Sequence, residues 1–155
     1  MSKRAFNRNT YDHCNSHIVF LLGNSPLYRF LLTDIILVTA SPGRVVVQLP
    51  LDHVHFNSKG GLHGSVSAAL VDFIGGVSIA SYDGRSNTGV STDMHISYVG
   101  SARAGDTIEI EGIVAKVGGT LAYTTATIRK VEEGKEEGEG AVVAIGSHTK
   151  FVKQR

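Results

Sequence analysis

The sequence predicts an α+β fold in which one antiparallel β-sheet wraps around a single long, buried central helix. Residues 64–82 form an apolar segment with helical spacing, two strand-like segments precede it, and four follow it. A helix that is apolar on most of its circumference is buried inside a protein. One sheet wrapped around that helix buries the apolar face of both, which is why we expect this architecture.

Length and composition fit one globular domain. The chain has 155 residues, of which 42% are hydrophobic and 19% are charged, so it can bury a substantial core. Its net charge of +1 gives no strongly basic surface, and we expect no nucleic-acid partner. The only cysteine, Cys14, excludes an intrachain disulfide and suits a reducing compartment. Its polar surroundings favour a packed or exposed thiol over a nucleophile.

The first residues are more polar than the rest. We expect residues 1–15 to form a flexible leader and residues 16–155 to form the single domain. The leader has three basic residues and no acidic residue before Asp12, which a mitochondrial presequence also permits, so the expected compartment is the cytoplasm or the mitochondrion. No apolar run reaches the length of about 18 residues that suggests a transmembrane helix, and we expect no membrane span.

Two helical pieces and two strands are expected before the central helix. Residues 16–32 have helical spacing in two pieces, and Ser25 can cap the second piece while Pro26 suits its first turn. Two β-branched runs, at 34–39 and 44–49, flank a Ser-Pro-Gly turn and predict a hairpin.

Four strands are expected after the central helix. These segments alternate or are rich in β-branched residues, and glycine-containing turns separate them. The charged run between the last two indicates a solvated hairpin loop. The expected strands are residues 89–99, 106–117, 119–131 and 141–152.

The histidines include a pair, His53 and His55, that would lie on one face of a strand. No cysteine or carboxylate follows at the spacing of a metal site, and we therefore expect no metal ion. We expect His148, in the last strand, to pack against its neighbours or to face solvent.

Asp72 is the only charged residue between Gly64 and Tyr82, in the middle of the central helix. A carboxylate in a buried helix is costly unless it is paired, hydrogen-bonded or functional. One interpretation is a structural aspartate that caps a loop or pairs with a buried arginine. The other is a catalytic group, and an Asp72 held by an internal cation would argue against it.

A loop with two adjacent glycines leads into the helix and carries Asn57, His63 and Gly64. Backbone amides at a helix N-terminus stabilise negative charge, so Gly64 is a candidate oxyanion donor. His63 either donates a hydrogen bond to a carbonyl or braces the loop. Ser91 begins the first strand after the helix, where it either returns beside Asp72 or makes a turn hydrogen bond.

Gly64 and Asp72 are too far apart to act on one carbonyl within one chain. Eight residues of helix span roughly 12 Å, whereas a reacting carbon needs both groups within about 3–4 Å. A second, antiparallel copy of the helix would bring Asp72 of one subunit opposite Gly64 of the other. We therefore expect a two-fold dimer with two composite sites.

Three motifs stand in order along the chain: Asn57-x-x-Gly60-x-Leu62-His63-Gly64, Leu70-x-Asp72 and Gly89-Val90-Ser91-Thr92-Asp93-Met94. Together they resemble the hotdog-fold acyl-CoA thioesterases, in the branch that contains the phenylacetate-pathway thioesterases and the thioesterase superfamily members. The segments 121–124 and 146–150 also resemble that family, and the similarity extends over residues 35–152.

The resemblance implies a hotdog fold and the hydrolysis of a fatty- or aryl-acyl-CoA thioester to a free acid and CoA. It implies that Asp72 is the general base or orients the attacking water, and that Ser91 assists it. The Gly64 amide would polarise the carbonyl, with Asn57 and His63 helping to position it. The implied partners are the acyl-CoA substrate and a second subunit, in dimers that commonly pair into tetramers, and no cofactor is implied beyond the CoA of the substrate.

One position departs from the family, which usually has His-Gly-Gly where this chain has His63-Gly64-Ser65. We expect the Ser65 side chain to affect loop freedom or substrate fit, so both His63 and Ser65 are candidate substrate-binding residues. Two alternatives to hydrolysis stay open, a non-catalytic acyl-CoA-binding protein and a hotdog hydratase, which would need a catalytic Asp–His pair. The acyl-chain preference and the residues that meet the CoA phosphates also stay open.

Overall fold

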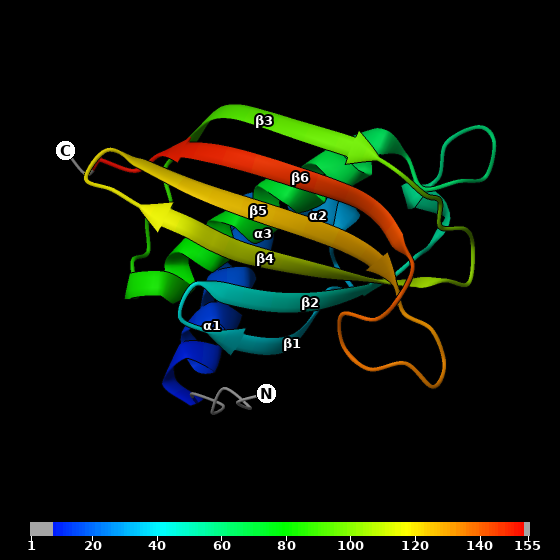
Figure 1. Cartoon of the computed structure of the whole chain (residues 1–155), viewed down its shortest axis with the longest axis horizontal. Helices are drawn as coiled ribbons and strands as arrows, with labels where there is room; N and C mark the ends of the chain where they lie inside the picture. The colour runs from blue at the N-terminus through cyan, green and yellow to red at the C-terminus, as the bar shows by residue number, and fades with distance from the viewer. Residues whose placement is uncertain (1–7, 154–155) are drawn as a thin grey trace.

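The computed structural model describes residues 8–153 and has the predicted architecture, one antiparallel sheet wrapped around a central helix (Figure 1). The six strands lie in the order β1-β2-β4-β5-β6-β3, and the helix α3 contacts all of them. Every expected strand is present, with ends within two residues of the prediction. The strands are β1 Ile36–Ser41, β2 Arg44–Pro50, β3 Val90–Tyr98, β4 Thr107–Val117, β5 Leu121–Lys130 and β6 Val142–Phe151.

The first helix, α1 (Arg8–Asn24), begins eight residues earlier than expected. The boundary predicted at residue 16 is therefore wrong, because residues 8–15 belong to the helix and not to a leader. Its polar sequence gives little helical periodicity, but Cys14 is fully buried and the Tyr11 hydroxyl donates to the Leu37 carbonyl of β1 at 3.0 Å. Tertiary contacts thus stabilise a helical segment that its own sequence pattern does not predict. The remaining seven residues of the expected leader lie outside the described part of the chain.

Burial also decides the state of Cys14. It raises the pKa of the thiol to about 11, so the side chain is a neutral packing group at physiological pH. Of the two outcomes expected for this thiol, packed or exposed, the packed one is confirmed.

The second helix, α2 (Pro26–Leu31), begins as predicted, because the Ser25 hydroxyl accepts the Tyr28 N–H and Pro26 occupies the first turn.

The central helix α3 (Gly64–Asp83) is buried along most of its length. Glycines on the sheet let it approach closely: a Cβ on Gly112 would lie 2.7 Å from Ile74 Cγ1, and one on Gly146 would lie 2.8 Å from Val71. Length and composition would also suit this helix to a membrane, but 72% of its most apolar 18-residue window is buried inside the protein. Its apolar character is therefore explained by the core.

We expected His53 and His55 to lie in a strand. They lie instead in a 3-10 helix, η1 (His53–His55). Asp52 caps this turn, and its backbone N–H donates to Nδ1 of His55 at 2.9 Å. The other ring nitrogen of His55 lies 2.7 Å from the Leu31 carbonyl. Nδ1 of His55 thus closes the cap of η1, and Nε2 joins η1 to α2.

Candidate active site

Asp72 lies one-third exposed at a cavity of about 320 Å³ between α3, α2 and β3. The side chain is 33% exposed, so the prediction that Asp72 lies in the buried core is wrong. Periodicity identified the helix as buried, but Asp72 points from its flank toward α2 and the edge strand β3. The cavity gives a small molecule access to the carboxylate.

Three side chains from separate elements bind the Asp72 carboxylate. The Tyr28 hydroxyl of α2 donates to Oδ2 at 2.5 Å. The Ser91 hydroxyl of β3 and Nζ of Lys150 in β6 both donate to Oδ1, each at 3.2 Å. All four residues line the cavity. The predicted return of Ser91 to the side of Asp72 is confirmed.

These contacts set the protonation state of Asp72. Burial raises the pKa of the carboxyl, but the Tyr28 hydrogen bond and the Lys150 ammonium outweigh burial, and the net pKa lies below its ordinary 3.8. Burial and the neighbouring carboxylate raise the pKa of Tyr28. At neutral pH the site therefore holds an ionised aspartate and a protonated tyrosine that donates to it.

The ion pair with Lys150 is the arrangement that would favour a structural role for Asp72. The Lys150 side chain is only 8% exposed, so it is an internal cation, although a lysine and not an arginine. A purely structural pair, however, would be enclosed by protein, whereas Asp72 is accessible from the cavity and also binds two hydroxyl groups. Pairing and function are compatible here, because Lys150 keeps the acid ionised without closing the cavity.

An irregularity in β3 directs Ser91 toward Asp72. The pairing of β3 with β6 shifts register between Ser91 and Asp93. In a regular strand Ser91 and Ile96 would point to opposite faces, because side chains alternate and the two are five residues apart. Yet Ser91 bonds to Asp72 of α3 while Ile96 packs against the core on the same side of the sheet. A bulge that re-aims one side chain reconciles the two, as bulges beside active sites commonly do.

His148 of β6 is a site residue that sequence reasoning missed. It is buried, one of the two outcomes expected for it, but its Nε2 also lies 2.8 Å from the Ser91 hydroxyl and 3.7 Å from Oδ1 of Asp72. Its Nδ1 is buried without a hydrogen-bond partner in the described part of the chain, and a Cβ on Gly75 would lie 3.0 Å from it. Burial first and Lys150 second lower the pKa of His148 below 6.5, against the opposite influence of Asp72 and Asp93. The ring is therefore neutral at pH 7.

The alternation of β6 was the signal that could have found both His148 and Lys150. Gly146, His148 and Lys150 are spaced by two, so they share the face of β6 that packs on α3. Two polar side chains at core positions call for partners inside the protein. The structure directs Lys150 inward, where its Nζ donates to Asp72.

The N-terminal end of α3 holds the other predicted residues. His63 caps the helix, and its Nδ1 accepts the Ser65 N–H at 3.1 Å and lies 2.7 Å from the Ser65 hydroxyl. Ser65, which stands where the family usually has glycine, therefore adds a second contact to the imidazole of His63. Asn57 organises the preceding loop, because its Oδ1 accepts the N–H groups of Lys59 and Gly61.

Gly64 is the first residue of α3, so its N–H has no intrahelical acceptor and points out of the helix end. The Tyr98 ring packs against it: a Cβ on Gly64 would lie 3.4 Å from the ring, and the Tyr98 hydroxyl donates to the Gly64 carbonyl at 3.2 Å. Within one chain this end of α3 is not brought to Asp72. The structure thus assembles Asp72 and Ser91 in one group, and Gly64, His63, Ser65 and Asn57 in another.

Comparisons with known proteins place this chain among thioester-cleaving enzymes. The thioesterase superfamily matches residues 59–137. Acyl-coenzyme A thioesterase 13 of Homo sapiens is 38% identical over 125 residues, which cover 81% of this chain and 84% of that protein. The same-named protein of Mus musculus is 33% identical over 127 residues, 82% of this chain and 86% of that one.

Solved structures agree with the sequence comparisons. Zebrafish thioesterase superfamily member 2 superposes with a TM-score of 0.76 at 30% identity, over 96% of this chain and 99% of that one. A hypothetical thioesterase of Streptococcus pneumoniae, solved with coenzyme A, superposes with a TM-score of 0.69 at 25% identity, over 80% and 93% of the two chains. The zebrafish structure matches nearly the whole chain, so the similarity includes the sheet and the central helix.

Proposed function

This chain belongs to the thioesterase superfamily, and from that premise we propose that it hydrolyses acyl-CoA thioesters to a free acid and CoA. The observation that carries the proposal is an ionised Asp72 that lines a cavity and lies beside the Ser91 hydroxyl. The relatives named acyl-coenzyme A thioesterase and the structure solved with coenzyme A support the substrate class. The proposed reaction uses no metal and no cofactor of its own.

In the proposed step, a water molecule bound to Asp72 and Ser91 attacks the thioester carbonyl carbon. The Asp72 carboxylate takes a proton from the water as the carbon–oxygen bond forms, and charge develops on the carbonyl oxygen. The unpaired Gly64 N–H at a helix N-terminus is suited to that oxyanion. Collapse of the tetrahedral intermediate breaks the carbon–sulfur bond, and the proton passes to the departing CoA thiolate.

The Gly64 of a second subunit is needed, since the Gly64 of the same chain is roughly 12 Å away along α3. The edge strand β3 offers the contact. It is exposed along almost its whole length, and its free edge includes exposed Val90 and Tyr98. Exposed edge strands with apolar side chains pair readily with another chain.

Antiparallel pairing of β3 with its two-fold copy explains how the site is completed. If the strands pair over their full length, the Ser91 end of one lies opposite the Tyr98 end of the other. Tyr98 packs on Gly64, and Ser91 binds Asp72. The pairing therefore brings the Gly64 end of one subunit to the Asp72 of its neighbour. We propose the homodimer as the smallest active unit and a pair of dimers as the tetramer.

A complementation experiment tests the composite site. Asp72→Ala and Asn57→Ala each remove one half of it, so each homodimer should lose most free-thiol release from acyl-CoA. A heterodimer of the two variants, isolated with two affinity tags, contains one intact site and one with both lesions. We expect it to recover about half of the wild-type activity per dimer.

Two other outcomes would contradict parts of the proposal. A heterodimer as inactive as its parents would show that each site lies within one chain, and the dimer argument would fail. A wild-type protein that binds acyl-CoA but releases no thiol would be the non-catalytic binding protein, which the occupied Oδ1 of Asp72 would then explain.

A further inference from the structure

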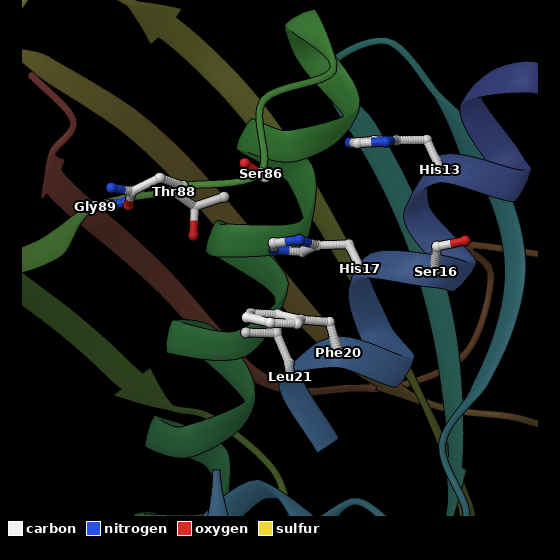
Figure 2. A pocket seen from close by; sticks show the side chains of 9 residues that line it. His13, Ser16, His17, Phe20, Leu21, Ser86, Thr88 and Gly89 are labelled. Carbon is white, nitrogen blue, oxygen red and sulfur yellow. The ribbon is translucent and has the colours of Figure 1, made fainter. Parts of the chain in front are cut away.

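A second, larger cavity of about 730 Å³, whose lining Figure 2 shows, adjoins the Asp72 cavity. The two share Leu21, Thr88 and Gly89 in their linings, so they are neighbours. Nothing in the proposed hydrolysis uses this second cavity. Its wall is α1 on one side and the segment after α3 on the other, and it is lined by His13, Ser16, His17, Phe20, Leu21, Ser86, Asn87, Thr88 and Gly89.

Two histidines of α1 line this cavity, and each ring has a buried nitrogen without a hydrogen-bond partner in the described part of the chain. Figure 2 shows the rings of His13 and His17 extending from α1 toward α3. The ring centroids are 6.4 Å apart, and the ring planes differ by 18°. His17 is only 6% exposed. The Nε2 atoms of both rings are buried, and neither has a hydrogen-bond partner among residues 8–153. A buried polar atom without a partner is destabilising, so its retention calls for an explanation outside the folded chain.

The cavity changes character along α1, from apolar near the Asp72 site to polar farther away. Leu21 lies at the junction and Phe20 beside it. His17 is one turn earlier, about 6 Å along the helix, and His13 is about 12 Å from Leu21. A ligand that enters from the Asp72 cavity thus meets apolar side chains first and imidazoles at its far end.

We propose that this cavity holds the distal part of the acyl group and that His17 and His13 bind a hydroxyl group at its end. The preferred substrates would be CoA thioesters of unbranched acyl chains with a terminal hydroxyl, an inference that rests on the proposed thioesterase function. Leu21 and Phe20 contact the methylene chain, and the His17 ring turns its buried Nε2 toward the cavity to form a hydrogen bond with the hydroxyl.

A neutral end group fits better than a charged one. The described residues that line the cavity include no lysine, arginine, aspartate or glutamate. Burial first, and the neighbouring His13 second, lower the pKa of His17, so the ring is uncharged at pH 7. A terminal carboxylate would therefore enter without a counter-ion, whereas a hydroxyl both donates and accepts as a neutral imidazole does. The phosphates of CoA are unsuited to the cavity for the same reason.

Matched substrates test this assignment. Purified wild-type enzyme, His17→Leu and His13→Leu would be assayed with pairs of unsubstituted and ω-hydroxy acyl-CoA esters, from hexanoyl to hexadecanoyl. The control is His53→Leu, which removes an exposed histidine outside both cavities. We expect wild-type kcat/KM to favour the ω-hydroxy ester about tenfold at the best chain length, the effect of one good hydrogen bond. His17→Leu should abolish that preference, His13→Leu should reduce it, and His53→Leu should leave it intact.

Truncated thioesters identify which end of the substrate occupies the cavity. The same acyl groups would be presented on N-acetylcysteamine, which lacks most of the pantetheine arm. If the acyl end occupies the cavity, the ω-hydroxy preference and its loss in His17→Leu persist with these esters. The opposite result would be a change in kcat/KM of His17→Leu that is equal for every acyl-CoA, acetyl-CoA included, and absent with the truncated esters. It would place pantetheine in the cavity and overturn the inference.

The failure of this inference is distinguishable from failure of the function. A wild-type enzyme that hydrolyses acyl-CoA with no ω-hydroxy preference at any chain length overturns only the substrate assignment. An unchanged preference in a folded His17→Leu variant does the same. A wild-type enzyme inactive on every ester would remove the proposed function and this inference with it. Because leucine at position 17 removes a buried unpaired nitrogen, we expect the variant to fold with a melting temperature at or above that of the wild type.

Discussion

Asp72 on α3 and Glu111 on β4 are both carboxylates that bind partly or largely buried cations. Glu111 accepts from Arg44 of β2 through Oε1 at 2.7 Å and from Arg129 of β5 through Oε2 at 3.2 Å. A guanidinium therefore holds each of its oxygens, and the cluster joins three adjacent strands. Asp72 has one cationic partner, Lys150. If ion pairing marked a functional site, Glu111 would be the stronger candidate.

What distinguishes Asp72 is the chemistry of its other neighbours and its access to space. Its remaining partners are the hydroxyls of Tyr28 and Ser91, and all three side chains line a cavity. Glu111 lines neither that cavity nor the one beside it. Arginine keeps its proton in proteins, whereas a carboxylate beside hydroxyl groups and room for water can take part in proton transfer. A cavity with neutral polar neighbours, and not an ion pair, is therefore the better indication of a site.

The largest expected effect separates the two carboxylates directly. Asp72→Asn keeps the size of the side chain but removes the base, so we expect kcat for acyl-CoA hydrolysis to fall by about 10²–10⁴-fold. Glu111→Gln makes the same chemical change in the other cluster. We expect it to leave kcat unchanged while lowering the free energy of unfolding by about 1.5–3 kcal/mol, the range for hydrogen bonds to charged groups.

Free-thiol release measures kcat, and urea denaturation measures stability in both variants. A loss of activity in Glu111→Gln as large as in Asp72→Asn would contradict the different roles of the two carboxylates. Normal kcat in a folded Asp72→Asn would leave Asp72 with the structural role that its ion pair permits.

A tenfold effect is expected from the hydroxyl of Tyr28. Tyr28→Phe removes the 2.5 Å hydrogen bond to Oδ2 of Asp72. The ring should keep its edge contact with Phe73, whose centroid lies 5.4 Å away at 81°, so the fold is retained. We expect kcat to fall about tenfold, equivalent to about 1.4 kcal/mol, because the carboxylate loses a fixed orientation.

The matched control for this change is Tyr11→Phe. It also removes a tyrosine hydrogen bond, the one to the Leu37 carbonyl, at a place outside the Asp72 cavity. It should lower the melting temperature with little change in kcat. Equal effects of both substitutions on kcat would mean that Tyr28 acts only through the stability of the helical layer.

Periodicity in the sequence was sufficient for much of this structure. It predicted six strands and the buried α3, because apolar patterns and turn residues are local signals. For Ser91 it left two outcomes open, and the structure shows the return beside Asp72. It did not predict that Asp72 would lie on the flank of α3, since that depends on which side of the helix α2 and β3 cover. The bulge after Ser91, which reverses the direction of one side chain, leaves no trace in composition.

The partners of Asp72 were harder to predict than Asp72 itself. Tyr28, His148 and Lys150 come from α2 and β6, and only the packing of these elements around α3 brings them together. The sequence contained one usable sign, the inward spacing of His148 and Lys150 along β6. Interpreting it required knowing that β6 pairs with β3, a non-local fact that alternation cannot supply.

The smallest expected effect concerns the pH profile, and it sharpens the contrast between Lys150 and the arginines of the Glu111 cluster. Lys150 helps to lower the pKa of His148, second to burial. When His148 is protonated, its positive charge 3.7 Å from Oδ1 stabilises the Asp72 carboxylate and weakens it as a base. We therefore expect kcat/KM to decline as pH falls through the His148 pKa, which lies below 6.5.

Lys150→Met should move that decline to higher pH without removing it. Without the ammonium, the His148 pKa rises toward its ordinary value, so protonation and the loss of rate begin earlier on acidification. The measurement is kcat/KM from pH 5 to 8, scaled to each variant's own plateau, because the substitution also changes the plateau by breaking the pair with Asp72. Arg129→Met removes a cation from the Glu111 cluster and should leave the decline where it is in the wild type. A shift in both variants would indicate a general effect of net charge, whereas no shift in Lys150→Met would mean that His148 does not control the activity of Asp72.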